Sequence, residues 1–101
     1  MPRRHKRNST NERATPAFCV FMDGTPAWYD SDTILPVTHA TERDAQLEIV
    51  EDLEERLQLF RQGDFSFEEA LTIDDYVVPV MVAPDGTLSD ASGYTYGKRK
   101  T

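Results

Sequence analysis

The sequence predicts an α+β fold, in which a small antiparallel sheet of four to five short strands is packed by one long amphipathic helix and one short helix. Residues 41–63 carry the apolar period of a helix, residues 76–82 form a near-continuous apolar run, and two Asp-Gly dipeptides stand where tight turns would join strands. The expected order is two or three strands, the long helix, the short helix and two strands.

The long helix is predicted over residues 41–63. Thr41 followed by Asp44 is a variant of the capping box, and Gly63 suits the left-handed position after a last turn. At about 100° per residue, the apolar side chains fall within one arc roughly 140° wide, as in a helix that lies on a core. We expect this arc to be buried; its members are Ala45, Ile49, Val50, Leu53, Leu57 and Phe60.

The opposite face of this helix is acidic, and the segment contains no lysine. Three like-charged pairs stand at i,i+4, each costing roughly 0.2–0.5 kcal/mol. A face selected only for stability would alternate its charges, so we interpret it as a surface for a basic partner, although most acidic runs are simply solvated faces. The predicted partner-binding residues are Asp44, Leu47, Glu48, Glu51, Asp52, Glu54, Glu55, Asp74 and Asp75.

The net charge of −7 is unevenly distributed along the chain. Residues 1–13 sum to +4, residues 98–100 to +3 and residues 14–97 to −14. We predict a flexible basic arm over residues 1–15, a single acidic domain over 16–97 and a basic tail over 98–101, because the ends contain too few apolar side chains to offset the entropy of ordering. A body this acidic attracts basic protein surfaces and repels nucleic acid.

Two hairpins are predicted. Residues 17–22 turn at Asp23-Gly24 into residues 25–29, which would place Cys19 opposite Trp28, and Pro26 confines the second strand to an edge or a short length. Residues 33–38 are expected to form another strand or an extended segment. The second hairpin joins 76–82 to 87–90 through a type I turn at 83–86, and 94–96 add a short extended piece.

A short helix is predicted over residues 67–71, between the long helix and the second hairpin. Ser66 and Glu69 make a capping box at its start. The aromatic and aliphatic side chains around it are expected to fill the core between helix and sheet; they are Phe65, Phe67, Leu71 and Ile73.

No pattern typical of a catalytic or cofactor site is present. The only histidines are His5 and His39, and there is no glycine-rich phosphate loop. Cys19 stands within an apolar run, where we expect a buried, unreactive thiol. Asp30 and Asp32, with His39, are interpreted as turn-forming and boundary residues in preference to metal ligands. We therefore predict a protein that is not an enzyme and has no cofactor or metal.

The basic ends offer an alternative function. They could contact phosphates without sequence specificity, through Arg3, Arg4, Lys6, Arg7, Lys98, Arg99 and Lys100. The chain contains neither a helix-turn-helix pattern nor an aromatic-basic sheet signature, so direct nucleic-acid binding is expected to be weak. No stretch approaches the ~18 apolar residues of a membrane span, and we expect a cytoplasmic protein without membrane contact.

The leading hypothesis is a non-catalytic module that binds a basic protein surface through its acidic helix face. In size, acidity and absence of catalytic motifs, the chain resembles small inhibitors encoded by phages and mobile elements, including DNA mimics and anti-CRISPR proteins; this resemblance is one of composition. The resemblance implies that the partner is a nucleic-acid-binding protein. The alternatives are an accessory subunit or a homodimer, formed through a sheet edge or through Leu47 and Leu59, and a weak nucleic-acid binder.

Overall fold

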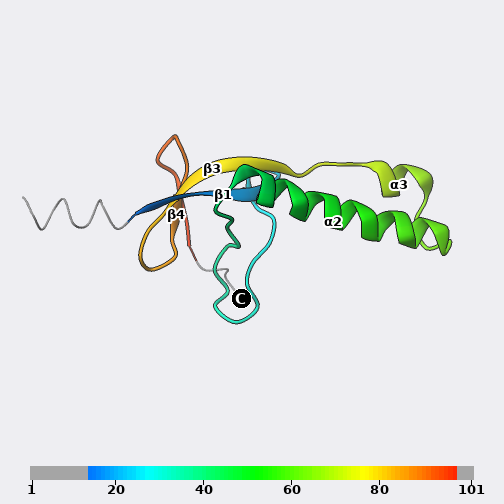
Figure 1. The fold of residues 1–101 in the computed structure, drawn as a ribbon, viewed down its shortest axis with the longest axis horizontal. Helices are drawn as coiled ribbons and strands as arrows, with labels where there is room; N and C mark the ends of the chain where they lie inside the picture. The colour runs from blue at the N-terminus through cyan, green and yellow to red at the C-terminus, as the bar shows by residue number, and fades with distance from the viewer. Residues whose placement is uncertain (1–13, 98–101) are drawn as a thin grey trace, which may run out of the picture.

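The computed structural model describes residues 14–97, so the predicted basic arm and tail lie almost entirely outside the described residues. An antiparallel sheet has the strand order β2-β1-β3-β4-β5, and two helices stand between β2 and β3 along the chain (Figure 1). The elements are β1 (Thr15–Met22), β2 (Thr25–Pro26), α2 (Glu42–Arg61), α3 (Phe67–Leu71), β3 (Tyr76–Val82), β4 (Leu88–Ser89) and β5 (Thr95–Tyr96). The predicted α+β class and element order are confirmed.

The sheet is built around the pairing of β1 with β3, which runs in register from Thr15 opposite Val82 to Phe21 opposite Tyr76. Because side chains alternate along a strand and opposed residues point to the same side, one face carries the main buried cluster. That cluster consists of Ala17, Cys19, Phe21, Val80 and Leu88. Val20 points to the other face and is also buried, so both faces of β1 are covered at this point.

Pro79 is accommodated in β3, an interior strand, because neither neighbouring strand needs its missing N–H. Opposite it on β1, the N–H and the carbonyl of Phe18 both bond to His39, each at 2.8 Å. On the other side, β4 pairs only with Met81 and Val82 and ends before it reaches the proline. A proline can therefore stand inside the sheet at this position, because no hydrogen bond of the sheet is lost there.

Helix α2 begins and ends as predicted. The hydroxyl of Thr41 accepts from the N–H of Asp44 at 3.1 Å. At the other end Gly63 has φ +87°, and its N–H donates to Phe60 at 3.0 Å while the N–H of Asp64 donates to Leu59 at 2.9 Å. These two bonds are a Schellman motif, which satisfies carbonyls that the last turn leaves free.

The predicted buried face of α2 is only partly buried, which corrects the sequence analysis. Ala45 is fully buried, and Ile49, Leu53 and Leu57 are half-buried. Val50 and Phe60, in contrast, are 44% and 41% exposed. The reason is visible in Figure 1, where α2 contacts β1 and β3 near its start and then continues beyond the end of the sheet, alongside α3.

Helix α3 forms over the predicted residues, with a complete capping box between Ser66 and Glu69. Its packing differs from the prediction, because five residues are too few to bury more than one narrow face. Ala70 is buried, whereas Phe67 remains 57% exposed even though its ring meets that of Phe60 with centroids 5.8 Å apart. Leu71 and Ile73 are also exposed and Phe65 is half-buried, so these residues do not fill a core between helix and sheet.

The first hairpin has the predicted turn, with Met22 opposite Thr25, and β2 is a short edge strand as Pro26 indicated. The prediction that Cys19 lies opposite Trp28 is wrong, because His39 occupies the edge of β1 beyond β2. Residues 33–38 form no strand and make one isolated bridge there, between Pro36 and Tyr29. The second hairpin is confirmed, with β5 added beyond β4.

Candidate functional site

Two adjoining cavities lie between α2 and the segments after β2 and α3, and together they form what we call the acidic groove. The first has a volume of about 340 Å³ and the second about 300 Å³. Trp28 and Asp52 line both cavities, so these two side chains form their common boundary. Glu48, Glu51 and Glu55 complete the first cavity, and Met22, Ala27, Arg56, Thr72, Asp74 and Asp75 complete the second.

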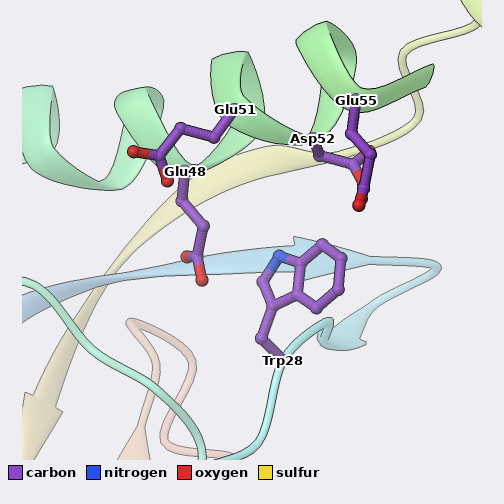
Figure 2. A pocket seen from close by; sticks show the side chains of 5 residues that line it. All are labelled: Trp28, Glu48, Glu51, Asp52 and Glu55. Atoms are coloured by element: carbon purple, nitrogen blue, oxygen red, sulfur yellow. The ribbon is translucent and has the colours of Figure 1, made fainter. Parts of the chain in front are cut away.

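Helix α2 supplies the carboxylates of the first cavity from one side of its surface. Glu48, Asp52 and Glu55 stand at i, i+4 and i+7, a spacing that keeps side chains on one face of a helix. Figure 2 shows the carboxylates of Glu48 and Glu55 directed towards the indole of Trp28, whereas Glu51 extends along the helix away from it. Several negative charges therefore surround one aromatic ring.

Trp28 is held opposite α2 by a loop that closes on itself. The N–H of Val37 donates to the carbonyl of Trp28 at 3.1 Å, and the next residue, Tyr29, is bridged to Pro36. The side chain of Trp28 is 37% exposed, so the ring is supported by the protein and remains accessible from the groove. This combination suits an aromatic side chain that contacts a ligand or a partner.

Asp30 makes the turn at the tip of this loop, as the sequence suggested. Its carboxylate accepts from the N–H groups of Asp32 and Thr33 at 2.8 and 3.0 Å. Hydrogen bonds from the backbone of Thr33 and then of Asp32 hold the pKa of Asp30 below its usual range, because they stabilise the charged form. His39 bonds elsewhere, to Glu48, so these side chains do not converge on one point.

Two of the carboxylates in the groove have partners inside the protein. An oxygen of Glu48 lies 2.9 Å from Nε2 of His39, and an oxygen of Asp52 accepts from Nε of Arg56 at 3.1 Å. No other ion pair occurs among residues 14–97, which leaves Glu51, Glu55 and the carboxylates after α3 unpaired there. The groove therefore keeps uncompensated negative charge on both sides of Trp28.

Among residues 14–97, Arg56 is the one cationic side chain that lines the groove, and its hydrogen bonds lie within the fold. Its Nη1 donates to the carbonyl of Glu69 at 3.1 Å and also to the carbonyl of Thr72, while Nε binds Asp52. These bonds tie the end of α3 to α2. Arg56 consequently lines the second cavity with Nε and Nη1 engaged within the fold.

Asp75, which lines the second cavity, has a raised pKa. Partial burial is the largest effect that raises the pKa of this carboxyl, and the neighbouring charge of Asp52 raises it further, while Arg56 acts in the opposite direction. A carboxylate that is disfavoured in this way is stabilised when a cation approaches. Both cavities are lined by carboxylates.

The structure brings together six of the nine predicted partner-binding residues. Asp74 and Asp75, which lie about twenty residues further along the chain, join the carboxylates of α2 because the segment after α3 returns beside the helix. Asp44, Leu47 and Glu54 are exposed and line neither cavity. The alternative basic residues at the two chain ends lie outside the described part of the protein.

Sequence reasoning missed Trp28 as a site residue. The sequence predicts a strand over residues 25–29, because an Asp-Gly turn favours continued pairing on both sides. The signal that could have identified it is local: the chain's single tryptophan stands directly before the turn-forming stretch from Tyr29 to Asp32, where a continued strand is disfavoured.

Cys19 belongs to the buried cluster of the sheet and is fully buried, as predicted. Burial, with a smaller contribution from Glu48, raises the pKa of Cys19 to about 12. The thiol is therefore protonated at neutral pH and is a poor nucleophile. Within residues 14–97, no group of three or more His, Cys, Asp or Glu side chains is arranged to hold a metal ion.

Comparison with known proteins finds no similarity from which a function could be transferred: no family model, no curated protein and no solved structure matches the chain. Among the described helices, none combines the length and the apolar character needed to cross a bilayer.

Proposed function

We propose that this protein is a non-catalytic binding module whose acidic groove receives basic side chains of a partner protein. The observation that supports the proposal is the arrangement of carboxylates from α2 and from the segment after α3 around the exposed indole of Trp28. Carboxylates attract lysine and arginine, and an aromatic face binds the same groups through cation–π contacts.

The partner that fits best is a nucleic-acid-binding protein, which would make this chain an inhibitor of the kind carried by phages and mobile elements. Carboxylates on successive helical turns are about 5.4 Å apart, close to the roughly 7 Å between phosphates of one strand. A basic surface built for a phosphate backbone can therefore accept such a row. The charge of −14 on residues 14–97 adds long-range attraction for the same surfaces.

Fluorescence of Trp28 provides a direct test, because it is the only tryptophan in the chain. The full chain is titrated with a synthetic hexa-arginine peptide at low and at moderate salt. We expect saturable changes in emission whose affinity falls as salt rises, since exposed charges are screened. In a second assay, the chain should displace labelled duplex DNA from the same peptide.

A matched pair of variants separates the groove from the general charge of the protein. Glu51→Lys with Glu55→Lys reverses two charges in the groove, and Asp44→Lys with Glu54→Lys reverses two on the same helix outside it. The first variant should lose at least about tenfold in affinity for the peptide, and the second much less. Equal losses would show that the groove is not the binding site.

A further inference from the structure

We infer that the acidic groove recognises an extended basic segment with arginines at alternate positions, one arginine side chain entering each cavity on either side of the Trp28 boundary. This inference rests on the proposed function and names the partner sequence that the same site selects. The site is a docking surface formed by one face of α2, the loop that carries Trp28, and the acidic segment after α3.

The spacing follows from the shared boundary of the two cavities. Trp28 and Asp52 line both of them, so the two cavities meet at these side chains, and the inference places one bound group on each side of the indole. Two planar groups in contact with opposite sides of a ring are about 7–8 Å apart, at 3.5–4.0 Å for each contact. In an extended peptide, side chains two residues apart point the same way and are separated by about 6.6–6.8 Å. Adjacent residues point in opposite directions and cannot fill both cavities.

Charge complementarity requires a cation in each cavity. Within residues 14–97, Glu51 and Glu55 in the first cavity form no ion pair, and neither do Asp74 and Asp75 in the second. Asp52, at the boundary, is already paired with Arg56, whose remaining hydrogen bonds go to backbone carbonyls. Each cavity thus offers two such carboxylates to one basic side chain of the partner.

Arginine suits this groove better than lysine for two reasons. A guanidinium is planar, so it can stack on the indole of Trp28 while its N–H groups still reach a carboxylate such as Glu55. It is also less strongly hydrated than an ammonium group, so entry into a half-enclosed cavity costs less desolvation. An ammonium group offers a point charge without the planar stacking surface.

Three synthetic peptides of equal charge and length provide the test. One carries Arg-Ser-Arg, the second Arg-Arg-Ser and the third Lys-Ser-Lys, each between the same neutral flanks. Binding to the full chain is measured by calorimetry and by Trp28 emission. We expect the Arg-Ser-Arg peptide to bind about fivefold or more tightly than either of the others, the scale of one added stacking contact.

Variants then assign each arginine to a cavity. Glu51→Gln with Glu55→Gln neutralises the first cavity, and Asp74→Asn reduces the charge of the second. Each should remove most of the preference for Arg-Ser-Arg over Arg-Arg-Ser, whereas the control Asp44→Asn with Glu54→Gln should keep it. Trp28→Leu, followed by calorimetry, should remove the preference for arginine over lysine.

The outcomes separate this inference from the proposed function. If the chain binds all three peptides with equal affinity, or if the control variant loses the spacing preference as fully as the groove variants, the paired-arginine inference is overturned while an acidic binding face stands. If no basic peptide binds at all, both are overturned. A preference for Arg-Ser-Arg that depends on both cavities supports both.

Discussion

The imidazole of His39 lies 2.9 Å from the carboxylate of Glu48, and this contact ties the sheet to helix α2 at the edge of the groove. The backbone of His39 is paired with Phe18 on β1 through two hydrogen bonds of 2.8 Å. One residue therefore contacts both strand β1 and helix α2. It also fixes the position of a carboxylate that lines the first cavity.

We predict that His39→Ala lowers the free energy of unfolding by about 1 kcal/mol, the usual contribution of a hydrogen bond. Both side chains of the pair are half-buried, so solvent screens the contact less than it screens an exposed ion pair. Urea unfolding measures the change. Glu54→Gln is the control, because Glu54 is exposed and makes no such contact; its effect should stay within about 0.5 kcal/mol. Equal effects for the two variants would contradict the prediction.

Arg56→Lys should destabilise the protein by about 2 kcal/mol, since hydrogen bonds to charged groups contribute roughly 1.5–3 kcal/mol. A lysine ammonium cannot reach Asp52 and the two carbonyls near the end of α3 with the geometry of a guanidinium. Unfolding in urea gives the total effect, and amide exchange in residues 67–72 should accelerate. Arg61→Lys is the matched control, because the one side-chain hydrogen bond of Arg61 within residues 14–97 goes to Gln58, at 3.5 Å. If Arg61→Lys destabilises the protein as much as Arg56→Lys, the hydrogen bonds of Arg56 do not account for the effect.

Gly86→Ala should be more destabilising than Gly93→Ala. Both glycines have positive φ, +91° and +89°, so alanine adds a backbone cost of about 1–2 kcal/mol at either position. A Cβ at Gly86 would also lie 2.5 Å from Cδ1 of Leu35, whereas nothing lies within 4 Å of a Cβ at Gly93. We expect Gly86→Ala to lower the free energy of unfolding by about 1 kcal/mol more than Gly93→Ala, because Leu35 must shift. Thermal or urea unfolding of the two variants measures the difference. Equal losses of stability would mean that Leu35 moves aside at no cost.

Cys19 should resist a thiol-reactive aromatic disulfide at pH 8 in the folded protein and react readily in urea. Its pKa is raised from 9.0 to about 12 by burial, so very little thiolate exists in the folded state and the sulfur is inaccessible. The time course of the absorbance of the released thiol is the measurement. Rapid modification of the native protein would show that the strand opens locally.

The same shift predicts how stability depends on pH. Well below pH 9 the thiol is protonated in both the folded and the unfolded chain, so Cys19 contributes no pH dependence there. As pH rises from about 9 towards 12, the unfolded chain ionises first, and the wild type loses stability relative to Cys19→Ala. Unfolding of the two proteins at pH 8 and at pH 10 measures this difference; a constant difference would contradict the raised pKa.

The local signals in the sequence were sufficient wherever the determining contacts are close in the chain. Thr41 and Ser66 cap their helices, and Gly63 ends the longer one, because each motif is completed by residues three or four positions away. The same holds for the turn at Asp23-Gly24 and for the limits of β3. The acidic character of α2 was also evident, because a helix of known period places its own side chains.

Only the tertiary structure decided which of those side chains act together. The helix extends beyond the sheet, which leaves Val50 and Phe60 exposed, and no periodicity encodes where a sheet ends. His39 occupies the edge of β1 beyond β2, so the hairpin does not continue through Trp28, and this residue lines the boundary of the groove. The approach of Asp74 and Asp75 to α2 likewise depends on the long return path through α3. Such contacts join residues far apart in the chain, and their free energies depend on the packing of the whole fold.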